Sequence, residues 1–182
     1  MARFYEKLTP EIREFIGKQH LFFVASAARE GRINLSPKGM DTFRILADDR
    51  VGYLDLTGSG NETAGHILHD GRLTIMLCSF DEKPLILRLY GRGQVVGQND
   101  SAWPELIGNF DPMPGQRQII LLRIESLQTS CGFGVPMYQL VEDRSTLVQW
   151  CEKKGPEGVR KYWADKNSRT IDGLETGISV KP

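Results

Sequence analysis

The sequence predicts a mainly β protein of the α+β class, an antiparallel barrel with peripheral helices. About six apolar segments have the length and composition of strands, and most of them are joined by hairpin-length connections. Few helical patterns lie between them, and short spacers of this kind favour an antiparallel barrel over a doubly wound parallel sheet. With 182 residues, 40% of them hydrophobic, the chain is expected to form one substantial core.

The strands are expected at residues 21–27, 33–46, 51–56, 72–80, 85–96 and 117–128. The second of these is interrupted at Pro37-Lys38-Gly39, where proline removes a backbone donor. Helical patterns occur after Thr9, which is placed to cap a first helix, and at residues 62–68, 100–110, 145–155 and 156–166.

The composition changes near Thr129, where the strand patterns end. A Gly- and Pro-rich stretch follows and then amphipathic helical patterns. We therefore expect a barrel domain at residues 1–128 and a helical extension at residues 129–182. The extension is expected to pack on the barrel or on a dimer partner, with Trp150 and Trp163 in the core or at an interface.

Composition limits the classes of partner. The 23 basic and 23 acidic residues balance, which argues against nucleic acid or an anionic membrane as the main partner. Three scattered cysteines without a C-x-x-C pair predict neither a disulfide framework nor a zinc site. The first fifteen residues are charged throughout and no long apolar run follows, so a cytoplasmic protein is expected.

The stretch LTGSGNETAGHI, residues 56–67, combines a Gly-rich turn with the start of a short helix. It lacks the lysine of a Walker loop, and its glycines do not have dinucleotide-fingerprint spacing. Ser59 and Glu62 fit a capping box, so the loop is explained either as a capped helix start or as an anion site. An anion there requires cations from elsewhere, and Lys38 and Arg44 on the preceding extended segment are the candidates.

Three segments together resemble the pyridoxamine 5'-phosphate oxidase-like flavoproteins: FFVASAAREGRINLSPKG, VGYLDLTGSGNETAGHI and RLTIMLC. The resemblance covers about residues 21–127 and implies an antiparallel FMN-binding split barrel that forms a homodimer. It also implies an FMN-dependent oxidoreductase acting on an unknown small molecule. Glu62 and Thr63 replace a basic pair of that family, so the enzyme is expected to differ from pyridoxamine 5'-phosphate oxidase itself.

By the same resemblance, Lys38 falls on the residue that binds the FMN phosphate, and Arg44 stays the second candidate cation from its place on the extended segment. Arg88 is expected to face the flavin ring. The polar loop contacts are expected at Thr57, Ser59, Gly60, Asn61, Glu62 and Thr63. No catalytic side chain is identified, and His66, His69 and Cys78 do not make a complete metal site. Two alternatives stay open: a non-catalytic flavin or haem binding or sensing protein, and a cofactor-free dimeric barrel.

Overall fold

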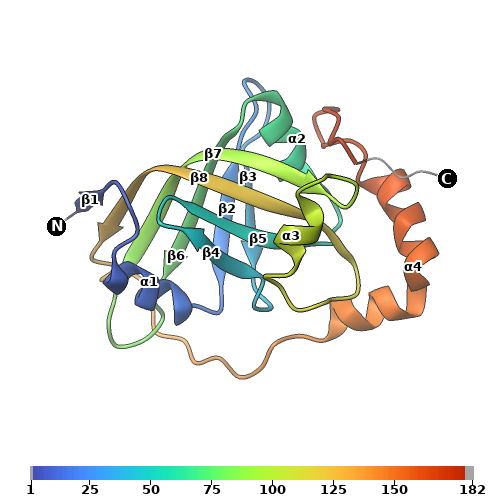
Figure 1. The fold of residues 1–182 in the computed structure, drawn as a ribbon. Coiled ribbons are helices and arrows are strands. Elements are labelled where there is room, and N and C mark those ends of the chain that lie inside the picture. The colour runs from blue at the N-terminus through green and yellow to red at the C-terminus, as the bar shows by residue number, and fades with distance from the viewer. Residues whose placement is uncertain (1, 179–182) are drawn as a thin grey trace.

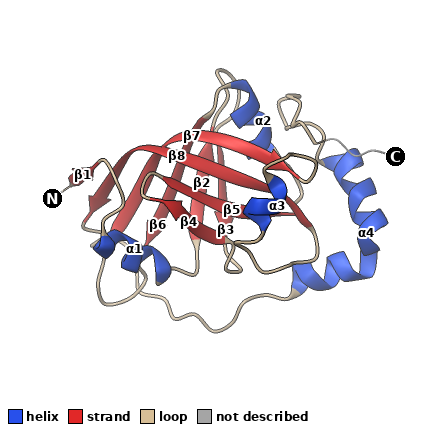
Figure 2. Ribbon diagram, in the orientation of Figure 1, coloured by secondary structure: helices blue, strands red, loops and turns tan. Residues whose placement is uncertain are grey.

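The computed structural model describes residues 2–178. The strands are β1 (Arg3–Tyr5), β2 (Phe22–Ser26), β3 (Asn34–Lys38), β4 (Phe43–Ala47), β5 (Arg50–Leu56), β6 (Arg72–Cys78), β7 (Ile86–Gly97) and β8 (Gln116–Ser130). The helices are α1 (Pro10–Gly17), α2 (Glu62–His69), α3 (Trp103–Ile107) and α4 (Thr146–Lys166). The helices lie around the strands, which confirms the predicted mainly β class (Figure 2).

The strands form one antiparallel sheet in the order β3-β2-β6-β7-β8-β5-β4, with β1 paired to β8 (Figure 1). The two edge strands, β3 and β4, are consecutive in the chain. Five Cα steps join Lys38 to Phe43 and span at most about 19 Å. A flat sheet of seven strands would hold its edges about 29 Å apart. The sheet must therefore curl until its edges approach, which makes an open barrel.

Alternation along β8 assigns its two faces. Ile120 and Leu122 belong to the large core cluster inside the barrel, together with α1 residues that close one end. Ile119 and Leu121 point to the outer face, where they join Leu106 of α3 in a second cluster. Side chains that alternate across a strand thus fill the interior and hold α3 outside it.

The structure corrects three local expectations and adds one strand. The single extended segment at 33–46 is two strands, because Met40 and Asp41 take positive φ and turn the chain between the two sheet edges. The short strand β1, which no sequence pattern indicates, pairs with β8. The 100–110 helix is only α3, since Asp100 accepts a hydrogen bond from the Gly97 N–H in a turn before it. Helix α2 starts after Asn61, without the capping-box bond expected of Ser59.

The C-terminal extension crosses the molecule before it returns to the barrel. After β8 the chain runs without helix or strand to α4, whose two predicted halves meet at a non-helical Gly155. Residues 167–178 then fold back toward α2 (Figure 1). We call these residues the C-terminal segment. Thr170 packs so closely on Gly65 of α2 that a Cβ at Gly65 would overlap its methyl group.

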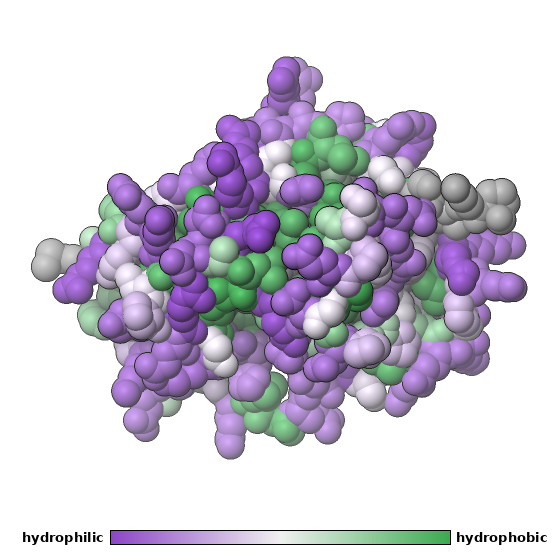
Figure 3. Space-filling model, in the orientation of Figure 1, coloured by the Kyte–Doolittle hydropathy of each residue, from purple (hydrophilic) through white to green (hydrophobic). Residues whose placement is uncertain are grey.

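The face shown in Figure 3 is mainly hydrophilic, with apolar groups gathered near its centre. Across residues 2–178, no helix has the length and apolar character needed to cross a membrane.

Candidate functional site

A cavity of about 720 Å³ lies between β3, the Gly-rich loop, α2 and the C-terminal segment. Strand β3 contributes one of its two faces. Asn34, Ser36 and Lys38 alternate with more exposed neighbours, and all three line the cavity. Period-two alternation therefore turns the strand's polar row toward the cavity.

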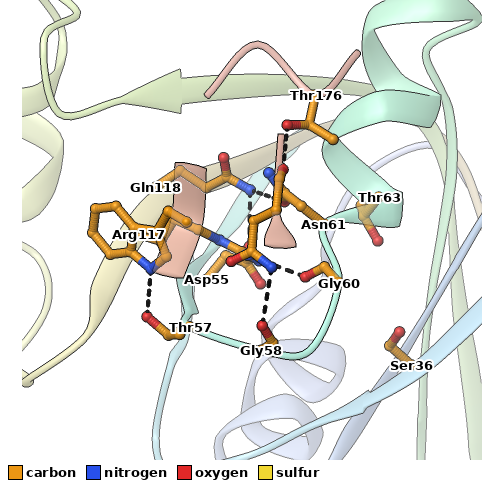
Figure 4. A network of polar contacts seen from close by, with 12 residues as sticks. Ser36, Asp55, Thr57, Gly58, Gly60, Asn61, Thr63, Arg117, Gln118 and Thr176 are labelled. Atoms are coloured by element: carbon orange, nitrogen blue, oxygen red, sulfur yellow. Dashed lines mark hydrogen bonds and ion pairs between the residues drawn. The ribbon is translucent and has the colours of Figure 1, made fainter. Parts of the chain in front are cut away.

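Asp55 at the end of β5 is the centre of a buried polar network (Figure 4). One carboxylate oxygen accepts a hydrogen bond from Lys38 Nζ at 2.8 Å. The other accepts from Arg117 Nη2 at 2.7 Å and from Gln118 Nε2 at 2.9 Å. Gln118 also donates to Asn61 Oδ1 at 2.7 Å. Since Lys38 and Asp55 belong to β3 and β5, their ion pair bridges the opening of the barrel.

The ionisation of Asp55 depends on two opposing influences. Burial disfavours the charged carboxylate, but the positive charges of Lys38 and Arg117 and the hydrogen bonds they donate outweigh it. The pKa of Asp55 therefore lies below its usual value. Next to it, burial raises the pKa of Tyr53 well above the usual value for tyrosine.

The Gly-rich loop is held from its inner side. Arg117 Nη1 donates to the Gly60 carbonyl at 3.0 Å and to Asn167 Oδ1 at 2.7 Å. Asn167 Nδ2 donates to the Gly58 carbonyl at 3.1 Å. In Figure 4 both glycine carbonyls point toward this network. Thr57, just before the loop, accepts a hydrogen bond from Trp163 Nε1 at 2.8 Å and donates to the Gly115 carbonyl.

A second polar group lies where α2 meets β2 and β3. Thr63 accepts a hydrogen bond from Asn34 Nδ2 at 3.2 Å, and Ser26 Oγ lies 3.1 Å from His66 Nδ1. His66 is 1% exposed, and its Nε2 atom has no hydrogen-bond partner among the described residues. The same is true of Asn61 Nδ2. Buried nitrogen atoms at the wall of the cavity thus have unused hydrogen-bonding capacity.

The C-terminal segment makes contacts on both sides of the cavity mouth. Asp172 pairs with the Arg32 guanidinium and accepts a hydrogen bond from the Arg32 backbone N–H at 2.7 Å. The Glu62 carboxylate accepts the Ile171 N–H at 3.1 Å. Glu62 therefore anchors the segment to α2.

The structure brings most of the predicted site residues together, but not all of them. The cavity is lined by Lys38, Ser59, Gly60, Asn61, Glu62 and Thr63. Thr57 lies behind the loop in the contacts with Trp163 and Gly115. Arg44 lies elsewhere, bonded to Asp41 and the Asn109 carbonyl, and Arg88 donates to Ser130 on β8. Neither of these arginines lines this cavity.

Sequence reasoning missed the residues that organise the loop from behind. Asp55 lies in a mainly apolar strand, and a buried charged residue usually has a partner of opposite charge. The sequence alone therefore indicates a buried ion pair at Asp55. In the sequence Arg117 is simply the first residue of an expected strand. Asn167 gave no sequence signal, because it approaches the loop only through the return of the C-terminal segment.

The fold and the site together define the class of protein. It is an open antiparallel barrel with a polar, mainly basic cavity beside a Gly-rich turn between a strand and a helix. Residues 8–131 match the sequence profile of pyridoxamine 5'-phosphate oxidase. The chain belongs to the pyridoxamine 5'-phosphate oxidase family. A relative in Aspergillus flavus, the pyridoxamine 5'-phosphate oxidase family protein ustO, is 39% identical over 96% of this chain and 77% of its own length.

Solved structures with this fold include HupZ of Group A Streptococcus. It is 19% identical, has a TM-score of 0.52, and the match covers 66% of this chain and 91% of that one. The FAD binding protein from Mycobacterium smegmatis is 11% identical, with a TM-score of 0.50 over 69% of this chain and 97% of that one. At these identities the likeness establishes the shared barrel.

Proposed function

We propose that the chain binds FMN non-covalently in the cavity and acts as a flavin-dependent oxidoreductase on a small molecule, as a cytoplasmic homodimer. Family membership supports a flavin, and one protein with the same barrel is named as an FAD binding protein. The observation that carries the proposal is the charge of the cavity lining. Five basic side chains line it (Arg32, Lys38, Arg117, Lys166 and Arg169), against two acidic ones (Asp55 and Glu62).

The residues present fit a phosphate-bearing cofactor. Asp55 is buried behind Lys38, with both of its oxygens occupied by donors. The Glu62 carboxylate, which replaces a basic family residue, accepts a hydrogen bond from the Ile171 N–H and so anchors the C-terminal segment. Lys38 lines the cavity and is 25% exposed, which supports its role as a partner of the phosphate. Ser59 and Thr63 offer hydroxyl groups to the phosphate or the ribityl chain.

A bound flavin supplies the redox chemistry, and the protein supplies binding, orientation and electrostatics. This division of labour fits a site that has charged and hydroxyl groups but no evident acid–base pair. A volume of about 720 Å³ is within the usual range for cofactor sites.

An absorption spectrum of the purified protein, before and after loading with FMN and desalting, tests the proposal. Flavin bands near ~370 and ~450 nm that survive desalting are expected. A Soret band would instead indicate haem. A colourless protein that does not retain FMN would contradict the proposal and favour a cofactor-free barrel.

Replacement of Lys38 tests its role directly. Lys38→Ala is expected to weaken FMN binding by about 1.5–3 kcal/mol, the range for a hydrogen bond to a charged group. The fold should persist, because Asp55 keeps Arg117 and Gln118. Lys161→Ala, an exposed position on α4, is the matched control. Equal FMN affinity in a titration of wild type and Lys38→Ala would rule out the assignment of Lys38 to the phosphate.

A further inference from the structure

The Gly-rich loop is fixed by hydrogen bonds to two of its carbonyl groups. The Gly58 carbonyl accepts from Asn167 and the Gly60 carbonyl accepts from Arg117, and these two donors are hydrogen-bonded to each other on one side of the loop. Ser36 and Thr63, which line the cavity, lie on the other side of the loop (Figure 4). The contacts therefore give the loop an inner side, where its carbonyls meet Asn167 and Arg117, and an outer side that faces Ser36 and Thr63 in the cavity.

The directions of the two carbonyls fix the directions of the backbone N–H groups that follow them. A trans peptide is planar, and its C=O and N–H point in opposite directions. With the Gly58 and Gly60 carbonyls turned inward, the N–H groups of Ser59 and Asn61 are turned outward, toward the cavity. Among the described residues neither N–H donates a hydrogen bond. Backbone N–H groups converging in this way, close to a lysine, suit an anion.

We propose that Asn167 is a positioning residue for the phosphate of the cofactor. By holding the Gly58 carbonyl inward it presents the Ser59 N–H to the phosphate, while Arg117 does the same for the Asn61 N–H. The inference rests on the proposed function, since it names how that site recognises the phosphate. It also gives Asn167, which does not line the cavity, a role in the site.

Asn167 itself is firmly placed. It is 0% exposed at the end of α4, and its backbone carbonyl accepts a hydrogen bond from Thr176 Oγ1 at 2.6 Å. Its side chain uses both ends, accepting from Arg117 and donating to Gly58. A residue fixed by two side-chain bonds and one backbone bond holds the loop without further loss of conformational entropy when a ligand binds.

The experiment compares FMN with riboflavin, which lacks the phosphate, by fluorescence titration of wild type and variants. Asn167→Asp keeps an acceptor for Arg117 but faces the Gly58 carbonyl with an oxygen in place of the N–H donor. FMN affinity should fall roughly tenfold or more, as expected for lost hydrogen bonds to a charged group, while riboflavin affinity stays unchanged. Asn167→Ala is the second variant, and Gln149→Ala, on the same helix, is the control.

Each outcome bears on one of the two proposals. A parallel fall for FMN and riboflavin would show a general structural role, and unchanged affinity for both would show no role; either result overturns the inference. Wild-type protein that binds FMN shows that such a failure concerns Asn167 alone. Wild-type protein that binds neither flavin overturns the proposed function and the inference together.

Discussion

The cavity is bordered by two sets of ionic contacts that differ in their surroundings. The inner set joins Lys38 and Arg117 to Asp55, whose side chain is 4% exposed. The outer set consists of two ion pairs. Arg32 pairs with Asp172 and joins the C-terminal segment to the mouth of the cavity, and Arg169 pairs with Glu175 within that segment. Both Arg32 and Arg169 are largely exposed. Both sets join carboxylates to basic side chains, but the inner carboxylate is buried, whereas in the outer set both arginines reach water and Asp172 itself is 17% exposed.

The difference in burial determines what each set contributes. An exposed pair is screened by water and salt, and holding two long side chains together consumes most of its gain. A buried pair is different, because removing one partner leaves a charge that the interior cannot solvate. The inner contacts should therefore hold the barrel edges and the loop in place, while the outer contacts should add little to the hold on the C-terminal segment.

The largest expected effect is the loss of the inner charge. Asp55→Asn leaves the buried Arg117 guanidinium without a counter-charge, so the free energy of unfolding should fall by about 3–5 kcal/mol. Urea unfolding followed by tryptophan fluorescence measures this change. A fall below about 1 kcal/mol, the usual value for an exposed pair, would show that the inner contacts behave like surface contacts.

Acid should weaken the inner set specifically. The pKa of Asp55 is lower in the folded protein than the value of about 3.9 in an unfolded chain. The folded state thus binds fewer protons there, and the stability from this group is present above about pH 5 and lost as the pH falls through the folded pKa. The stability gap between wild type and Asp55→Asn should narrow from about pH 5 downward. A gap independent of pH would contradict the assignment.

Packing between α2 and the C-terminal segment should give an intermediate effect. Gly65→Ala improves helix propensity by up to about 1 kcal/mol but forces a methyl group into Thr170, which is 6% exposed. Overpacking of this kind costs about 1–3 kcal/mol, so a net loss is expected.

Thr170→Ser supplies the matched test of that clash. It removes the methyl group but keeps the hydroxyl that accepts the Leu174 N–H. Gly65→Ala combined with Thr170→Ser should therefore recover stability in urea unfolding, and the double-mutant cycle should show coupling between the two positions. Additive effects would mean that the two residues do not compete for the same space.

Much of the fold follows from local sequence. Apolar runs such as residues 72–78 and short connections are enough to predict an antiparallel barrel, because period-two burial and turn residues are local signals. The break at Met40 and Asp41, which sends the chain from one sheet edge to the other, looks in the sequence like an irregular strand. This break decides which strands form the two edges of the sheet, and local sequence patterns say little about strand order.

The site is predictable on one side only. Lys38 and the loop residues at 59–63 lie in contiguous motifs, so a family resemblance predicts them, and all of them line the cavity. Asp55, Arg117 and Asn167 belong to the network that holds the loop carbonyls, but they come from three widely separated positions in the printed sequence. Arg44 is predicted beside the phosphate because it follows Lys38 on the same extended segment. In the structure it pairs with Asp41 and does not line the cavity.

The smallest effect is expected at the outer set. Asp172→Asn makes the same chemical change as Asp55→Asn, and the new amide oxygen still accepts the Arg32 backbone N–H. Since Arg32 stays exposed to water when its partner loses its charge, the midpoint of urea unfolding should remain within experimental scatter of wild type. Any residual difference should disappear at high salt, where exposed charges are screened. A shift comparable to that of Asp55→Asn would mean that the C-terminal segment is held as rigidly as the inner network. The distinction between the two sets would then fail.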